Sequence, residues 1–229
     1  RFLRDSNLKL DSRRSLGTAI KEKDPLIQAD YEAFVDALAS QLARPLIGDQ
    51  SWASYHIIRM KRAANFSVPG AGKTAMVLAA FSYLYHQGLV DKIMMVGPLN
   101  AFESWKKEWR ATLGDHIPLK AFDYQEQPLS TASKRHDAIV YGAKDTNLIL
   151  MNYESLKGNI DELNSVIDSK TFLVFDEVHR IKSITGERAR AALSLCKKAV
   201  YRVVMTGTPV PNGYLDIYNF LHILFPDEY

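Results

Sequence analysis

Ser67-Val68-Pro69-Gly70-Ala71-Gly72-Lys73-Thr74 is the stretch of sequence that decides the fold. It follows a predicted strand and opens a predicted helix, which is the setting of a phosphate-binding loop. Gly70 and Gly72 let backbone N–H groups turn toward phosphate oxygens, and the start of the helix adds the positive end of its dipole. Lys73 is expected to reach the β- and γ-phosphates of a nucleotide, and the Thr74 hydroxyl to bind Mg²⁺. The alternative is a chance Gly-rich turn.

Outward from this loop, short apolar runs alternate with amphipathic helical runs, which predicts an α/β fold with a mostly parallel sheet and helices on both faces. Runs such as Ile93–Val96 are apolar throughout, as in strands buried on both faces. The predicted strands are Ala63–Val68, Lys92–Gly97, Leu119–Tyr124, Asn147–Asn152, Thr171–Asp176 and Val200–Thr206. The predicted helices between and after them are Thr74–Gln87, Asn100–Leu113, Thr131–Tyr141, Asn159–Ser169, Gly186–Lys197 and Tyr214–Leu224.

A second chemical signal is Asp176-Glu177-Val178-His179, which ends the apolar strand that begins at Thr171. Two carboxylates thus emerge at the carboxyl edge of the sheet, where ligands of such folds bind. We expect Asp176 to hold Mg²⁺, mostly through water, and Glu177 to polarise the attacking water as a general base. The alternative is an acidic strand end that caps the next helix.

A third signal is Thr206-Gly207-Thr208-Pro209, again at the end of an apolar strand. Its hydroxyls can bond to a neighbouring carboxylate or to a water that senses phosphate. A plain strand-to-loop turn also fits this tetrapeptide.

Together these segments resemble the first RecA-like lobe of superfamily 2 helicases, in particular the SWI/SNF-like DNA translocases, over roughly Gln50 to Phe225. Six fragments in the same order carry the likeness. They are the phosphate loop, Val96-Gly97-Pro98-Leu99-Asn100 followed by Trp105, Met151-Asn152-Tyr153-Glu154, Asp176-Glu177-Val178-His179, His179-Arg180-Ile181-Lys182-Ser183, and Thr206-Gly207-Thr208-Pro209-Val210-Pro211-Asn212. The resemblance implies a RecA-like P-loop NTPase domain that hydrolyses ATP with Mg²⁺ to move along duplex DNA.

The resemblance also implies roles for single residues. The catalytic set is Lys73, Asp176, Glu177, Thr206 and Thr208, the nucleotide-binding set is Gln50, Pro69, Gly70, Ala71, Gly72, Lys73 and Thr74, and the metal ligands are Thr74 and Asp176. The resemblance implies that Gln50 recognises the adenine base. The alternative is that Gln50 is a surface residue beside a helix cap. The residues implied to contact a nucleic-acid backbone are Pro98, Leu99, Asn100, Tyr153, Glu154 and Lys182, with Arg180 near the ATP site and Arg188 and Arg190 as possible additions or solvated residues. Such binding is independent of base sequence and sensitive to salt.

The expected partners are duplex DNA, with RNA left open, and a second RecA-like lobe of the same polypeptide that supplies arginine fingers. Without that lobe we expect slow or negligible hydrolysis. The segment Asn65–Pro69 departs from the acidic segment usual in eukaryotic remodellers, which points to a bacterial or archaeal branch. By analogy, defence, restriction or repair complexes are expected partners, in the cytoplasm and at the nucleoid if the source is bacterial. The rival functions are a P-loop ATPase of another class and a non-catalytic helicase-like binding module.

The composition and the distribution of charge divide the chain into two parts. Its 229 residues are 47% hydrophobic and 24% charged, which excludes a disordered or collagen-like chain. Residues 1–24 hold seven basic and four acidic side chains, hence the whole net charge of +3. We expect them to be a solvated, loosely ordered terminus, or else to contact phosphates. The predicted domains are a basic, helical extension at 1–48 and an ATP-binding lobe at 49–229, with the second helicase lobe absent from this sequence.

Three smaller expectations complete the sequence analysis. The single cysteine, Cys196, is expected to be a small core residue. Trp105 and Trp109, one helical turn apart, are expected to pack in the core, with base stacking as the alternative. The histidines lack metal-ligand spacing, so no zinc site is predicted, and no apolar run is long enough for a membrane span.

Overall fold

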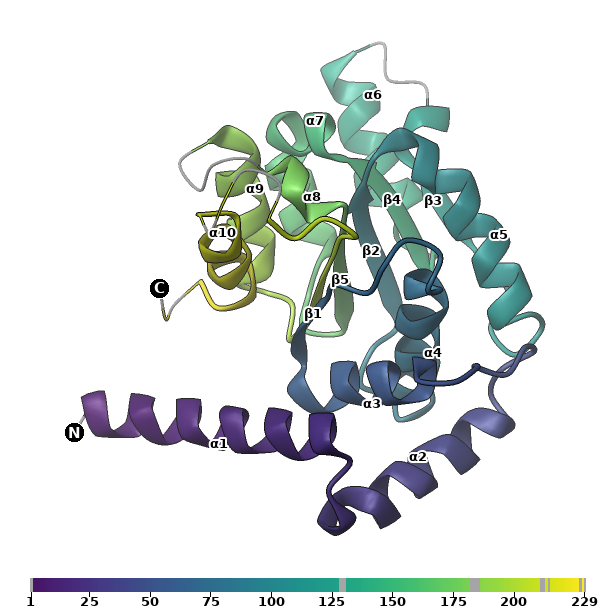
Figure 1. The fold of residues 1–229 in the computed structure, drawn as a ribbon. Coiled ribbons are helices and arrows are strands. Elements are labelled where there is room, and N and C mark those ends of the chain that lie inside the picture. The colour runs from purple at the N-terminus through teal and green to yellow at the C-terminus, as the bar shows by residue number, and fades with distance from the viewer. Residues whose placement is uncertain are drawn as a thin grey trace.

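Six strands form one sheet at the centre of the molecule, in the order β1-β6-β5-β2-β4-β3 (Figure 1). All five pairs of neighbouring strands are parallel. The structure, a computed structural model, describes residues 2–127, 131–181, 186–210, 213, 215–226 and 228, apart from the side chains of 2–9 and of Arg188. The predicted α/β class with a mostly parallel sheet is confirmed.

The strands are short and almost entirely buried. Their bounds are β1 Arg62–Asn65, β2 Lys92–Gly97, β3 Ala121–Asp123, β4 Leu148–Asn152, β5 Thr171–Asp176 and β6 Tyr201–Met205. The sequence predicted β2 and β5 to the residue. It made β1 too long, because the chain turns at Asn65, whose side-chain Oδ1 accepts a hydrogen bond from the backbone N–H of Ser67 at 3.2 Å.

Helices precede, connect and follow these strands. The α-helices are α1 Phe2–Glu22, α2 Gln28–Ala39, α3 Gln50–Met60, α4 Lys73–His86, α5 Phe102–Thr112, α6 Ala132–Asp137, α7 Tyr153–Leu156, α8 Ile160–Val166, α9 Glu187–Cys196 and α10 Leu215–Leu224. The 3₁₀ turns are η1 Pro25–Ile27, η2 Leu99–Ala101, η3 Tyr124–Glu126, η5 Lys157–Asn159 and η6 Val178–Arg180, and η4, Ala138–Gly142, is a π-helical turn. The predicted helix 131–141 is therefore split, with α-helical geometry ending at Asp137.

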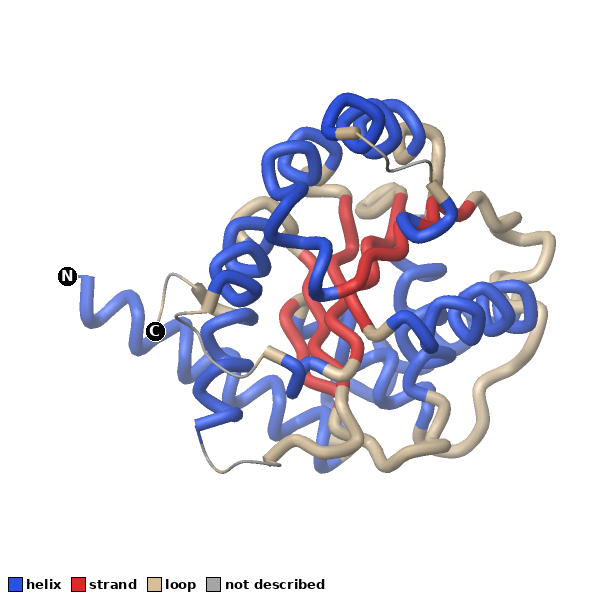
Figure 2. Tube along the Cα trace, turned by 90° about the horizontal axis from the view of Figure 1, so that it is seen from above, coloured by secondary structure: helices blue, strands red, loops and turns tan. Residues whose placement is uncertain are grey.

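Helices lie on both faces of the sheet (Figure 2). Two clusters of buried apolar side chains form the core, one on each face. Within β2, Ile93 and Met95 point to the layer that contains α2 to α5, whereas Met94 and Val96 point to the layer with α7 to α10. This alternation is the period of two of a strand, with both faces buried. Trp105, Trp109 and Cys196 are buried, so the core interpretations of all three are confirmed.

The N-terminal segment is helical over residues 2–22, so the predicted helical extension is confirmed there, whereas the loose order that its charge suggested is not observed. Residues 2–22 form helix α1, which runs along the bottom of Figure 1 with its first turns away from the sheet. Two apolar residues one turn apart anchor its far end, because Ile20 is 5% exposed and Leu16 packs beside it. Arg13 forms an ion pair with Glu228 at 2.6 Å and lies over the Phe225 ring. A polar helix can thus be fixed by a few contacts near one end.

Helix α2 also packs into the layer that covers the sheet, through Phe34 and Leu38. None of the helices among the described residues combines the length and the apolar character that a membrane span requires.

Candidate nucleotide site

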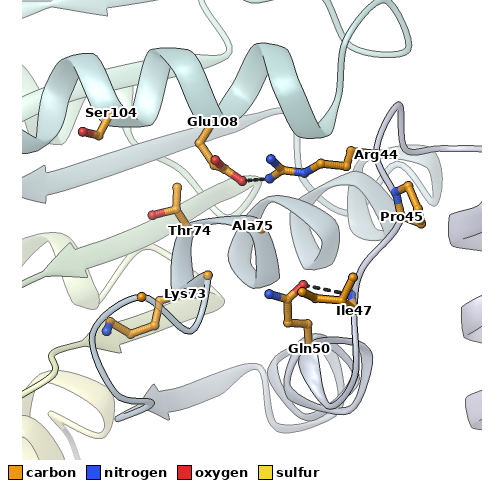
Figure 3. Close-up of a pocket in the computed structure, with 11 residues that line it drawn as sticks. Arg44, Pro45, Ile47, Gln50, Lys73, Thr74, Ala75, Ser104 and Glu108 are labelled. Atoms are coloured by element: carbon orange, nitrogen blue, oxygen red, sulfur yellow. Dashed lines mark hydrogen bonds and ion pairs between the residues drawn. The ribbon is translucent and has the colours of Figure 1, made fainter.

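A cavity of about 810 Å³ lies at the carboxyl edge of the sheet, beside the start of α4 (Figure 3). It is lined from three directions: by the segment before α3, by the phosphate loop with the first turn of α4, and by α5. The lining residues are Arg44, Pro45, Ile47, Gln50, Gly70, Gly72, Lys73, Thr74, Ala75, Ser104 and Glu108. Five of the seven residues assigned to nucleotide binding by resemblance, Gln50 among them, thus line it together with Ala75 and side chains of α5.

The phosphate loop has the backbone conformation that its glycines suggested. Gly70 and Gly72 have φ angles of +82° and +81°, a left-handed region that favours glycine. Gly72 is the N-cap of α4, so the unpaired N–H groups of the first helical turn face the loop. A Cβ atom on Gly72 would lie 2.5 Å from Nε2 of Gln50. At Gly72, both the positive φ and the nearby Gln50 side chain therefore disfavour any residue with a Cβ.

Lys73 is turned back onto its own loop. Its Nζ donates to the backbone carbonyls of Ser67 at 2.9 Å and of Val68 at 3.3 Å. These carbonyls hold the ammonium group at the loop, where phosphate oxygens would compete for the same hydrogens. A lysine at the first position of α4 can therefore exchange loop carbonyls for an anionic ligand.

Gln50 lies in the first turn of α3 and contacts the phosphate loop directly. Its Nε2 donates to the carbonyl of Ala71 at 2.9 Å, and its Oε1 accepts from the N–H of Ile47 at 3.0 Å. Gln50 is half-buried, and these contacts join it to the phosphate loop. The Ser54 hydroxyl, 2.9 Å from the carbonyl of Met76, links the same helix to α4.

An ion pair between Arg44 and Glu108 crosses the mouth of this cavity, joining the segment after α2 to α5 (Figure 3). This pair was not predicted from the sequence. Oppositely charged residues 64 positions apart give no local signal of a contact.

A second cavity of about 400 Å³ adjoins the first, since Thr74 and Ser104 line both. Its other lining residues are Pro98, Asn100, Ala101, Trp105, Asp176, Glu177, His179 and Arg180. The Thr74 hydroxyl and the Asp176 carboxylate, the two predicted metal ligands, therefore face one space. Oxygen donors of this kind suit Mg²⁺.

Asp176 is held by two aromatic side chains from other parts of the chain. Nε1 of Trp105 donates to its Oδ2 at 2.9 Å, and the Tyr153 hydroxyl donates to its backbone carbonyl at 2.8 Å. Burial raises the pKa of the Asp176 carboxyl, and the hydrogen bond from Trp105 opposes that rise. Neither contact was predicted from the sequence, in which Trp105 was assigned to the core and Tyr153 to a nucleic-acid surface.

Glu177 and the Thr206 segment form one network. Glu177 has a left-handed φ of +52°, and its Oε2 accepts from the Thr206 hydroxyl at 3.1 Å. Thr206 also accepts from the Thr208 N–H at 3.1 Å and lies 2.9 Å from Nδ1 of His179. Since the single hydroxyl hydrogen of Thr206 goes to Glu177, Nδ1 of His179 is the donor in its contact. The network joins the ends of β5 and β6.

The residues assigned to nucleic acid divide into exposed and buried ones. Leu99 and Asn100 are exposed, as is Glu154, which accepts from Asn152 at 3.0 Å. Pro98 and Tyr153 are buried behind them. Arg180 and Arg190 are exposed, whereas Lys182, Ser183, Pro211, Asn212 and the side chain of Arg188 lie outside the described residues.

Comparisons with known proteins agree with this geometry. The family described as "SNF2-related domain" matches residues 67–229. A zebrafish (Danio rerio) SWI/SNF-related matrix-associated actin-dependent regulator of chromatin subfamily A containing DEAD/H box 1A is 28% identical over 162 residues, which are 70% of this chain and 16% of that protein. Putative protein p41 of Acyrthosiphon pisum secondary endosymbiont phage 1 is 31% identical over 172 residues, or 71% of this chain and 35% of that protein.

Among solved structures, the Sulfolobus solfataricus SWI2/SNF2 ATPase core in complex with dsDNA superposes with a TM-score of 0.66 at 21% identity. The match covers 82% of this chain and 37% of that one, which supports the RecA-like fold. The chain thus spans between about a sixth and about a third of the curated relatives described above.

Proposed function

The chain belongs to the SNF2-related family, and from this premise we propose that it is the ATP-binding lobe of a motor that moves along duplex DNA. The observation that carries the proposal is the arrangement of phosphate loop, Asp176, Glu177 and Thr206 around two adjoining cavities. The lobe comprises residues 49–229, and residues 1–48 are a helical extension packed against it.

The proposed nucleotide is ATP, with its phosphates on the Pro69–Thr74 loop and its base toward Gln50. Positive φ angles at two glycines and the start of α4 support the phosphate position. Thr74 and Asp176 would hold Mg²⁺, which when bound neutralises charge on the β- and γ-phosphates. The oxygen donors of these two side chains on one cavity support that assignment.

Glu177 is proposed to accept a proton from the attacking water. Its carboxylate accepts a hydrogen bond from Thr206, which fixes its orientation. The hydroxyl of Thr206 is the shared hydrogen-bond partner of Glu177, Thr208 and His179. A movement of Glu177 would therefore be felt by Thr206 and Thr208.

A second RecA-like lobe is proposed to complete the motor. The longer chains of the relatives support this proposal, since this chain spans 16% and 35% of two of them. An arginine supplied from outside the lobe is worth about 10³–10⁵ in rate in systems of this kind. The isolated lobe should therefore hydrolyse ATP slowly.

Duplex DNA is proposed as the track, as in the Sulfolobus ATPase core solved with dsDNA. The exposed Leu99, Asn100 and Glu154 and the candidate cation Lys182 would face its backbone.

The test is the ATPase rate of the full-length protein without nucleic acid and with single-stranded DNA, duplex DNA or RNA. Duplex DNA should stimulate most, and Lys73→Ala should lower the stimulated rate by about 10²–10³-fold, the usual effect of removing one preorganised charge or donor. Equal rates under all four conditions would instead indicate an ATPase of another class. A Lys73→Ala protein that kept its biological function would indicate a non-catalytic binding module.

A further inference from the structure

Two hydrogen bonds lead from the candidate DNA-facing segments to the same residue. Trp105 lies in α5, directly after the 98–101 segment, and bonds the Asp176 carboxylate at 2.9 Å. Tyr153 opens α7, next to Glu154, and bonds the Asp176 backbone carbonyl at 2.8 Å. The side chain and the main chain of one residue are therefore held from two different segments.

Both aromatic side chains are stiff connections. Each is 1% exposed, so neither can leave its place without opening the core. The segment 98–101 is continuous with α5, because Ala101 is both the last residue of η2 and the N-cap of α5. Movement of this segment is therefore transmitted to the first two turns of the helix, where Trp105 lies.

The strand end that leads into the 98–101 segment also lies close to Asp176. A Cβ on Gly97, the residue before Pro98, would lie 3.1 Å from Cβ of Asp176. The end of β2 thus passes close to the backbone and Cβ of Asp176. Displacement of the 98–101 segment should move the carboxylate with it.

Comparable residues in the molecule lack this connection. Trp109, one turn further along α5, is equally buried, but its Nε1 donates to the carbonyl of Ile117 at 2.8 Å. Tyr124 is 5% exposed, and its hydroxyl bonds Asn159. These contacts satisfy polar atoms without reaching the candidate site.

We propose that Trp105 and Tyr153 are positioning residues that couple duplex DNA binding at residues 98–101 and 153–154 to metal–nucleotide binding at Asp176. Trp105 acts on the carboxylate and sets its orientation toward the metal. Tyr153 acts on the backbone and sets the place of the strand end. The inference rests on the proposed function and adds to it the path between the two ligands.

The experiment measures binding of a fluorescent ADP analogue to the full-length protein while Mg²⁺ is titrated, with and without a duplex DNA of arbitrary sequence. In the wild type, DNA should change the Mg²⁺ concentration needed for half-maximal binding. Trp105→Phe should raise that concentration about 10-fold without DNA, as expected when a residue that orients a metal ligand is removed. The effect of DNA should be lost in the same variant.

Matched variants distinguish the loss of a hydrogen bond to Asp176 from the loss of packing in the core. Trp109→Phe removes an equally buried indole from the same helix and should leave the Mg²⁺ requirement unchanged. Tyr153→Phe should weaken the effect of DNA with little change in the Mg²⁺ requirement, and Tyr124→Phe should change neither. Nucleotide affinity in EDTA should be the same in all four variants, which shows that each is folded.

A double variant tests whether Trp105 works through Asp176. In an Asp176→Asn background, Trp105→Phe should have no further effect on the Mg²⁺ requirement. The inference is overturned if Trp105→Phe raises the Mg²⁺ requirement as much in the Asp176→Asn background as in the wild type. It is also overturned if Trp105→Phe and Trp109→Phe have equal effects. A wild type whose ATPase is stimulated by DNA but whose Mg²⁺ requirement does not respond to DNA overturns the inference alone. A wild type that neither binds DNA nor is stimulated by it overturns the proposed function together with the inference.

Discussion

The two sides of the nucleotide site are built by different means. On the phosphate-loop side, backbone conformation makes the site: Gly70 and Gly72 have positive φ, and Lys73 bonds carbonyls of its own loop. On the opposite side, side chains from separate elements bond one another, with Thr206 at the centre and Asp176 held by Trp105 of α5. One side is local in sequence and the other depends on tertiary contacts.

This difference determines which substitutions each side tolerates. A side built from backbone geometry should fail when a Cβ is added at a critical glycine. A side built from side-chain hydrogen bonds should fail when one hydroxyl or indole N–H is removed, with its backbone unchanged. The predictions below test this contrast, from the largest effect to the smallest.

Gly72→Ala should have the largest effect. Its φ of +81° costs an alanine about 1–2 kcal/mol, and the new Cβ would lie 2.5 Å from Nε2 of Gln50. We expect nucleotide affinity to fall about 100-fold, since each 1.4 kcal/mol is a factor of ten. Equilibrium binding of a fluorescent nucleotide measures the loss.

Gly70→Ala is the matched control for this prediction. Its φ of +82° imposes the same backbone cost, but nothing lies within 4 Å of the added Cβ. It should lose less affinity than Gly72→Ala. Equal losses would show that Gln50 does not limit the space at the loop.

Thr206→Val should affect turnover more than nucleotide binding. It removes the hydroxyl that bonds Glu177 and leaves the Thr208 N–H without its acceptor. Each unsatisfied group costs about 1–3 kcal/mol, so we expect the DNA-stimulated rate to fall about 10-fold or more. Steady-state ATPase kinetics separate kcat from KM.

The control is Thr171→Val, at the other end of β5. Thr171 is fully buried and its hydroxyl bonds Asp168, so a similar loss of stability is expected without a change in rate. If both variants lost the same fraction of activity, the Thr206 network would be structural only.

The sequence predicted the phosphate-loop side well because its signals are local. Glycine spacing specifies a loop whose dihedral angles few other residues adopt, and the fully apolar runs located β2 and β5 to the residue. The same local rule made β1 too long, since the turn at Asn65 depends on one side-chain hydrogen bond.

The opposite side could not be predicted in the same detail. An indole that is both buried and bonded to a carboxylate 71 positions away has the same sequence pattern as an ordinary core tryptophan. The unconfirmed expectation of a loosely ordered N-terminal segment has a similar cause. Charge dominates its composition, whereas its order depends on Ile20 and on the pairing of Arg13 with Glu228.

Protonation of His56 is expected to have a smaller effect, on the stability of the fold. His56 lies in α3, the helix that also carries Gln50. Burial lowers the pKa of His56 below its usual value, so the unfolded chain binds this proton more readily than the folded one. Stability should therefore fall as pH decreases below about 6.5, the usual histidine value, through the lowered pKa.

Replacing His56 with Gln should reduce this acid sensitivity. We expect the difference in Tm between pH 7.5 and pH 5.5 to shrink by roughly 2–4 °C, which for a chain of this size corresponds to about 1 kcal/mol. His116→Gln, at an exposed position, is the control and should respond to pH as the wild type does. An unchanged pH response in the His56 variant would contradict the prediction.

The strand order has a consequence for synthesis of the chain on the ribosome. β1, which leads into the phosphate loop, has β6 as its one neighbour in the sheet, and Arg62 pairs with Arg202, 140 residues later. At about 5–20 residues per second, translation leaves roughly 7–28 s during which the loop is made but its strand has no partner. A nascent chain stalled before residue 200 should therefore not retain ATP, and acquisition of nucleotide would mark the completion of the lobe.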